Sequence, residues 1–211
     1  MRSSPLALSL FLFAASSSAC EPPRDPPRPP QHKLADEEED HGPIPIGECA
    51  SFESAERERA LAFHRGLVLA LESANAHGGV DGHPLELRTL DDRGRPGEAR
   101  RAVERFRAQN DVVALAGGTS CATARAIAAA AQGLVFVSPC DQLERGAGVL
   151  PLAAAEMDAR LAALWNEHYG ADSLTSEAGL GWRAGTILID ALEHAPSLAA
   201  KDLAASLARV H

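Results

Sequence analysis

The sequence predicts an α/β fold, a doubly wound parallel sheet with helices on both faces, in three layers. Two observations lead to this prediction. Segments with strand periodicity and segments with helix periodicity alternate strictly between residues 44 and 137. The segments Val112–Ala116 and Leu134–Val137 are almost wholly apolar, which is typical of strands buried on both faces of a parallel sheet. Residues 43–211, which can form a core, have the length of one domain.

The first half of this domain alternates strand and helix. Ile44–Cys49 is the first expected strand, and Leu85–Leu90 is the second because its apolar and polar residues alternate. Gly78-Gly79 is a typical helix end, and Pro96 suits a helix start. The expected helices of this half cover residues 54–76, 96–109 and 123–132.

The second half is expected to be mostly helical. We expect a short fifth strand at Val149-Leu150. Apolar residues at helical spacing then predict three helices, at residues 154–168, 177–193 and 198–209.

The N-terminal residues have the pattern of a secretory signal peptide. Arg2 precedes an apolar run, and small residues follow up to Cys20. Small residues directly before a cysteine also match the bacterial lipoprotein signal, so we expect a signal peptide at 1–19 and lipid on Cys20. This predicts a location in the cell envelope, facing the periplasm or the cell surface, with the membrane reached through the lipid anchor. Ordinary signal cleavage is the alternative, because Ser17 stands where leucine is usual.

Residues 20–42 are expected to form a disordered tether. They are rich in proline and then acidic, with DEEED at residues 36–40, and almost no apolar side chain is available for a core. No later segment has the length and apolarity of a membrane span. The net charge of −9 disfavours nucleic acid as a partner.

The stretch Phe63–Glu144 resembles the branched-chain amino-acid-binding (leucine-binding) family, the type I periplasmic substrate-binding receptors of ABC transporters. The resemblance is carried by FHRGLVLALESANAHGGVDGHPLELRTLDDRGRP and by VVALAGGTSCATARAIAAAAQGLVFVSP. A second match is YGADSLTSEAGLGWRAGTILIDALEHAPSL, with Trp182 where that family usually has Tyr or Phe. Full-length members carry a second lobe between the positions of Glu144 and Gly148, so the resemblance implies a single lobe here.

The resemblance implies recognition of a small solute, such as an amino acid, outside the cytoplasm, with an ABC permease as partner and without a cofactor. It places the ligand carboxylate at Ser120 or Cys121, where the start of a helix also provides backbone N–H groups. The expected ligand-binding residues are Ser120, Cys121, Ser138, Cys140, Asp141 and Gln142. The alternative function is an interaction module without a tight ligand, which forms a homodimer or docks through the face that a second lobe would cover.

Three cysteines remain besides Cys20, which allows one disulfide and one free thiol. The leading hypothesis pairs Cys49 with Cys121, because the first and third strands are expected to be neighbours. Cys121 with Cys140 is the alternative.

Catalysis and metal binding are not expected. Gly118–Ala122 has part of a hydrolase nucleophile elbow, but Ala122 replaces its last glycine. No histidine follows a strand beside an acidic partner; His64, His77, His168 and His194 are all expected on or at the ends of helices. The histidines and cysteines lack the paired short spacing of metal sites, and Asp91-Asp92 is expected to have a structural role in its loop.

Overall fold

The computed structural model describes residues 42–153, 158–170 and 172–209, and the structural statements below concern these residues. The expected signal peptide at 1–19 lies outside them, as do the anchor and tether at 20–42 except for Gly42. Within the described part, every helix is too short or too polar to cross a bilayer.

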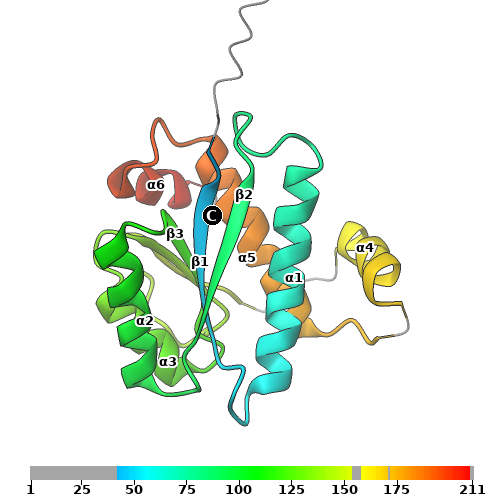
Figure 1. Ribbon diagram of the computed structural model, residues 1–211, viewed down its shortest axis with the longest axis horizontal. Coiled ribbons are helices and arrows are strands. Elements are labelled where there is room, and N and C mark those ends of the chain that lie inside the picture. The colour runs from blue at the N-terminus through cyan, green and yellow to red at the C-terminus, as the bar shows by residue number, and fades with distance from the viewer. Residues whose placement is uncertain (1–41, 154–157, 171, 210–211) are drawn as a thin grey trace, which may run out of the picture. The chain divides into compact units, whose positions relative to one another are not determined.

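A five-stranded parallel sheet forms the centre of the fold, in the order β2-β1-β3-β4-β5 (Figure 1). Its central pairing places Ile46 beside Ala114 and Cys49 beside Gly117. The predicted doubly wound parallel sheet is therefore confirmed. The strands are β1 (Ile44–Ala50), β2 (Leu85–Asp91), β3 (Ala114–Gly117), β4 (Val135–Ser138) and β5 (Val149–Pro151).

Six helices in the described part accompany the sheet, and their ends follow local capping signals. Pro96 begins α2, and Ser120 and Asp158 cap α3 and α4 through their side chains. The helix expected at 154–168 begins in the structure only after Asp158, and residues 154–157 lie outside the described residues. The helices are α1 (Arg57–Asn75), α2 (Pro96–Gln109), α3 (Cys121–Ala130), α4 (Ala159–Tyr169), α5 (Ser176–Glu193) and α6 (Ala200–Leu207).

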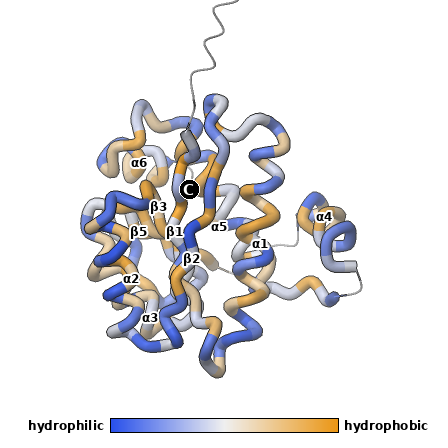
Figure 2. The backbone as a smooth tube through the Cα atoms, viewed as in Figure 1, coloured by the Kyte–Doolittle hydropathy of each residue, from blue (hydrophilic) through white to orange (hydrophobic). Residues whose placement is uncertain are grey.

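The helices cover both faces of the sheet, as three layers require. The core on one face joins the strands to α1, α5 and α6, and the core on the other face joins them to α2 and α3 (Figure 1). The connection from β1 to β2 crosses the sheet in one direction, and the connections from β2 to β3 and from β3 to β4 cross it in the other. Helix α1 of the first connection therefore lies on one face, and α2 and α3 of the other two lie on the opposite face. Figure 2 shows the hydrophobic residues gathered in the strands and more polar residues along α2 and α4.

A small third core attaches α4 to the outer side of α1 and α5. Leu161 and Trp165 of α4 pack there against Leu69 of α1. The indole N–H of Trp182 on α5 donates to the Asp158 carboxylate over 2.9 Å. This contact fixes the start of α4 against α5.

Helices α1 and α5 approach each other closely because glycines lie in their interface. A Cβ on Gly66 would collide with the backbone carbonyl of Ala178, and one on Gly181 would collide with that of Phe63. Gly66 belongs to the FHRGL part of the sequence resemblance, and this contact gives a physical reason for a glycine at that position.

Candidate functional site

The carboxyl edge of the sheet is the place where this fold binds ligands. In a doubly wound sheet the crevice lies where neighbouring strands send their connections in opposite directions, which here is between β1 and β3. Ser51 and Phe52 follow β1 at this edge, and Asp92 follows β2. The segments that follow β3 and β4 are residues 118–120 and 139–148.

The loop after β3 lies tightly against β1. Gly117 and Gly118 have positive φ angles of 119° and 68°, which a glycine adopts at little cost. A Cβ on Gly117 would collide with the carbonyl of Cys49. The N–H of Gly118 donates to that same carbonyl over 2.9 Å. The two glycines therefore let the chain turn at the switch point and enter α3.

The N-terminus of α3 is capped and still has free donors. The Ser120 hydroxyl accepts the N–H of Thr123 at 3.2 Å, and the Thr123 hydroxyl donates to the Ser120 carbonyl at 3.0 Å. Among the described residues, the backbone N–H groups of Cys121 and Ala122 have no acceptor. A helix N-terminus carries partial positive charge, so this group of donors suits a carboxylate.

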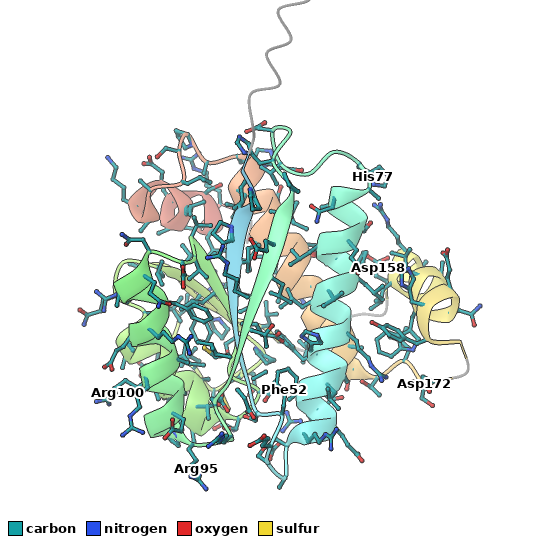
Figure 3. The ribbon with its side chains drawn as sticks, in the orientation of Figure 1. Phe52, His77, Arg95, Arg100, Asp158 and Asp172 are labelled. Carbon is teal, nitrogen blue, oxygen red and sulfur yellow. A yellow bond between two sulfur atoms is a disulfide. The ribbon has the colours of Figure 1, made fainter. Side chains whose placement is uncertain are left out.

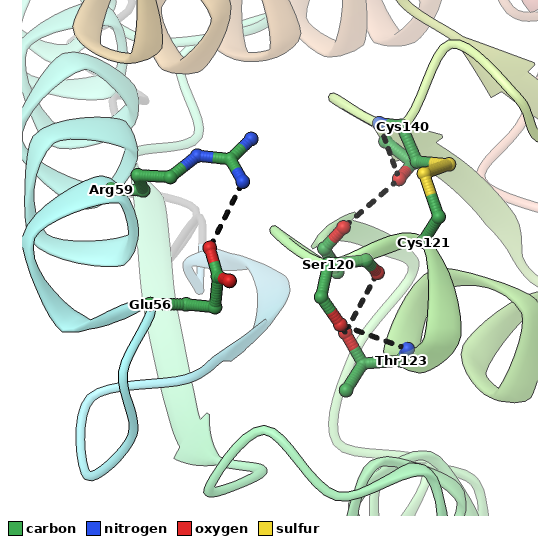
Figure 4. Close-up of a disulfide and its surroundings, with 8 residues drawn as sticks. Glu56, Arg59, Ser120, Cys121, Thr123 and Cys140 are labelled. Atoms are coloured by element: carbon green, nitrogen blue, oxygen red, sulfur yellow. Dashed lines mark hydrogen bonds and ion pairs between the residues drawn. A yellow bond between two sulfur atoms is a disulfide. The ribbon is translucent and has the colours of Figure 1, made fainter.

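A disulfide joins Cys121 to Cys140, with their Cα atoms 5.2 Å apart (Figure 4). The leading prediction, Cys49 with Cys121, is wrong, and the alternative pairing is the one in the structure. The neighbouring-strand argument applies equally to β3 and β4, whose following segments carry Cys121 and Cys140. Cys49 instead lies within β1 and points into the core formed with α2 and α3.

Cys49 is the free thiol of the described residues and is fully buried. Burial raises the pKa of this thiol, and the nearby charges of Asp92 and Glu48 raise it further. The thiol therefore stays protonated and unreactive in the folded protein.

The structure brings four of the six predicted ligand-binding residues together. Ser120, Cys121 and Cys140 lie around the disulfide, and buried Ser138 connects their loops. The Ser138 hydroxyl donates to the Gly118 carbonyl at 3.4 Å and accepts the Cys140 N–H at 3.3 Å (Figure 4). This pair of bonds holds the two loops at a fixed separation.

The other two predicted ligand-binding residues, Asp141 and Gln142, are exposed side chains in the turn after the disulfide. Neither makes a side-chain hydrogen bond or ion pair in the described part of the chain. Their contact with a ligand stays a prediction.

Thr119 is a residue of this edge that the sequence reasoning did not single out as ligand-binding. It lies between the glycines and the helix cap, and it is only 5 % exposed. Its hydroxyl oxygen is buried and has no partner among the described residues. A buried hydroxyl normally has a hydrogen bond, so this one is available to a polar partner. The sequence could have indicated Thr119 through its position, because it directly follows Gly117-Gly118 at the end of an expected strand.

Asp91 at the end of β2 and Asp92 directly after it join two loops of the edge. Asp91 accepts the N–H of Phe52 at 3.0 Å, and Asp92 accepts the hydroxyl of Ser51 at 2.6 Å. The expected structural role of this pair is therefore confirmed. Asp92 is fully buried, its second oxygen has no described partner, and burial raises the pKa of this carboxyl.

A buried carboxylate and a histidine form a pair that the sequence did not reveal. Glu48 of β1 is fully buried, and its Oε2 lies 2.6 Å from Nδ1 of His64 on α1. The hydroxyl of Thr89 donates to the same oxygen at 3.0 Å, while Oε1 has no partner in the described residues. The hydrogen bond to Glu48 raises the pKa of His64 despite partial burial. His64 lies on α1, as expected, and its acidic partner comes from β1 of the sheet on which this helix packs.

Two further features lie away from the carboxyl edge. A hollow of about 290 Å³ lies between α1, α4 and α5, with Trp182 and Arg160 among its lining residues. Near it, Asp190, Glu193 and His194 place three possible metal-ligand atoms within 4.8 Å of one another. All three are at least partly exposed, and His194 already contacts the Asp190 carboxylate at 3.0 Å.

Together, the strand order and the helix start at the switch point define one lobe of a type I periplasmic binding protein. The family model described as "Periplasmic binding protein" matches residues 43–150. The chain belongs to this family, whose members bind solutes.

Two solved structures have a fold similar to that of this chain. The leucine-binding protein LivK from Thermotoga maritima has a TM-score of 0.64 at 14% identity, over 78% of this chain and 87% of that one. A putative branched-chain amino acid ABC transporter protein from Rhodospirillum rubrum has a TM-score of 0.56 at 14% identity, over 79% of this chain and 89% of that one. At these identities the likeness concerns the fold.

The branched-chain amino acid transporter substrate-binding protein LivJ from Streptococcus pneumoniae, solved with isoleucine, is 27% identical over 46% of this chain, with a TM-score of 0.45. The match spans 28% of the LivJ chain. No curated protein matches this chain.

Proposed function

We propose that this protein recognises a small solute with a carboxylate, such as an amino acid, at the carboxyl edge of its sheet. The observation that carries the proposal is the start of α3 at the switch point. The free N–H groups of Cys121 and Ala122 lie there, and Thr119 precedes them in the chain with a buried hydroxyl that has no partner in the described residues. Backbone donors at a helix start bind carboxylates without a cationic side chain.

The loops around this helix start are held in place before any ligand arrives. The disulfide between Cys121 and Cys140 joins the two segments covalently, and the Ser138 hydroxyl bonds both of them. Preorganised donors lose little entropy on binding, which favours affinity. A single lobe leaves the ligand partly in water, so we expect weak binding, in about the millimolar range.

The proposed place of work is outside the cytoplasm, with lipid on Cys20 and a tether over residues 20–42. Support comes from the signal-like N-terminal sequence and from membership of the periplasmic binding protein family. The proposed partner is an ABC permease, since LivJ, to which this chain is similar, is a transporter substrate-binding protein. Mass spectrometry of the protein from a bacterial membrane fraction tests the lipid anchor. We expect an acylated Cys20 at the new N-terminus, and an unmodified Cys20 would contradict the anchor.

Thr119→Val tests the binding site itself. Valine has nearly the shape of threonine and lacks the hydroxyl, so it removes a buried polar atom that has no partner. The unfolding free energy should stay constant or rise by up to about 1 kcal/mol. Affinity for a ligand that bonds this hydroxyl should fall about two- to tenfold.

Thr123→Val is the matched control. The Thr123 hydroxyl is also buried, but it donates to the Ser120 carbonyl. Its loss should lower the unfolding free energy by about 1 kcal/mol. Calorimetric titration and chemical unfolding separate the two variants. A Thr119→Val protein that binds amino acids as the wild type does would remove Thr119 from the site.

An interaction module remains the second candidate function. The sequence-based expectation places this contact on the face that a second lobe would cover. The hollow between α1, α4 and α5 offers a different surface for a contact, away from the carboxyl edge. Light scattering coupled to size-exclusion chromatography tests self-association. A dimer that dissociates when Arg160, on the rim of this hollow, is changed to Glu supports this candidate, and a monomer at all concentrations counts against it.

A further inference from the structure

Phe52 is the aromatic side chain nearest in sequence to the switch point. It follows β1 directly after Ser51 and is half-buried. Figure 3 places it at the lower end of the sheet, between the strand ends and α1. Its backbone N–H is fixed by the Asp91 carboxylate at 3.0 Å. The ring therefore stands at the edge where a ligand would bind.

The ring of Phe52 rests on His64. Their centroids are 5.5 Å apart and the rings are nearly perpendicular, at 89°. Such edge-to-face contacts are favourable aromatic arrangements. His64 in turn depends on Glu48, whose carboxylate holds Nδ1 at 2.6 Å. Three residues thus connect the buried centre of β1 to the carboxyl edge.

We propose that Glu48 and His64 are positioning residues that hold Phe52 beside the proposed ligand site at the carboxyl edge, and that this support weakens when His64 loses its proton. The effect on a ligand rests on the proposed function, whereas the coupling of Phe52 to His64 does not. Glu48 and His64 themselves lie below the edge and are not proposed to touch the ligand.

The direction of the effect follows from the charges around His64. Glu48 on β1 favours the protonated imidazole, and Arg65 on α1 opposes it. Thr89 on β2 donates to the same oxygen of Glu48, and Phe52 in the loop after β1 contacts the imidazole ring; both side chains are neutral. When His64 is protonated, its charge balances the buried carboxylate. After deprotonation the carboxylate lacks a counter-charge in a dry environment, which disfavours the close packed arrangement.

Nuclear magnetic resonance of the ligand-free protein tests the coupling. With labelled phenylalanine and histidine, the Phe52 ring signals should shift with pH at the same midpoint as His64. Phe136 is buried in β4 under α2 and α3 and serves as the internal reference, which should not move at that midpoint. Phe52 signals that stay constant through the His64 titration would overturn the proposal.

Two variants sharpen the result. Glu48→Gln removes the charge partner, so the His64 midpoint should fall and the Phe52 shift should follow it. His64→Gln retains a hydrogen-bond donor without a titrating ring, so the Phe52 signals should then be independent of pH. This variant tests the coupling by itself if Glu48→Gln does not fold. His77→Gln is the control, because His77 lies exposed beyond the end of the same helix and bonds only the Ser73 carbonyl. It should leave the Phe52 titration unchanged.

Titration with L-leucine at about pH 5.5 and about pH 8.5, on either side of an ordinary histidine pKa, gives the functional readout. Affinity should fall about two- to tenfold at the higher pH, the range of one lost aromatic contact. In His64→Gln this fall should be absent. If leucine does not bind at either pH while Phe52 follows His64, the proposed function for leucine fails and the positioning role stands. If leucine binds equally at both pH values, Phe52 does not contact the ligand and this part of the proposal fails.

Discussion

Glu48 and Cys49 are neighbours on β1, and their side chains enter opposite cores. Glu48 meets His64 of α1 on one side of the sheet, and Cys49 lies under α2 and α3 on the other. The alternation of a strand predicts that neighbours face opposite sides. The sequence contains no sign that His64 is the partner of Glu48, because only the packing of α1 on the sheet brings the two together.

The pair predicts a pH dependence of stability. The pKa of His64 is raised in the folded protein, so its contribution to stability is fully present below the unfolded value of about 6.5 and is lost as the pH rises through the folded value. The difference in melting temperature between wild type and His64→Gln should therefore shrink between about pH 6 and about pH 9. Differential scanning calorimetry measures it. A difference that is independent of pH would contradict the assignment.

The cysteines predict a pattern of chemical labelling. Cys49 is buried with a raised pKa, so it should resist alkylation in the native protein and react after unfolding. Cys121 and Cys140 should react only after a reductant is added. Peptide mass spectrometry assigns each site. Alkylation of Cys121 without reductant would contradict the disulfide.

At the scale of elements, periodicity predicted the helices and strands well and their ends less well. The strand expected from Val112 begins at Ala114, and the helix expected from Thr123 begins at Cys121. For the helix the reason is local. The Ser120 side chain accepts the N–H of Thr123, so α3 begins at Cys121, two residues earlier than expected. Capping depends on backbone angles that apolar periodicity does not report.

Substitution by alanine should have opposite effects at a glycine in the contact of α1 with α5 and at a glycine in open space on α2. Gly66→Ala places a methyl group against the Ala178 carbonyl and should lower the unfolding free energy by about 1–3 kcal/mol. Gly97→Ala in α2 meets open space and should raise it by up to about 1 kcal/mol. Urea unfolding of both variants measures this. Equal effects would show that the helices do not need the glycine contact.

At the scale of the whole molecule, strict alternation of strands and helices was sufficient to predict the doubly wound sheet. It also placed the segments of Ser120 and Cys140 at one edge, where the structure has them. It did not decide the disulfide, because both β1 and β4 border β3. Cys49 lies within β1, whereas Cys121 and Cys140 lie in the segments that follow β3 and β4. Thr119 and Phe52 escaped notice because their significance comes from burial and ring contact, which are tertiary properties.

The same scale governs affinity. A lobe whose carboxyl edge is open can supply the helix start and one wall, and water reaches the rest of the ligand. The helix start favours negative charge, so the carboxylate should contribute most of the binding free energy. A ligand without a carboxylate should therefore bind much more weakly than an amino acid. Non-specific adsorption to the edge would show no such difference.

Calorimetric titration with L-leucine and with 3-methylbutylamine, which is leucine without its carboxylate, tests whether the carboxyl edge is a carboxylate site. We expect leucine to bind at about millimolar concentration, Thr119→Val to bind it more weakly, and the amine not to bind. Equal binding of leucine and the amine would contradict a carboxylate site at the start of α3, as would the absence of binding by leucine and every other amino acid tested.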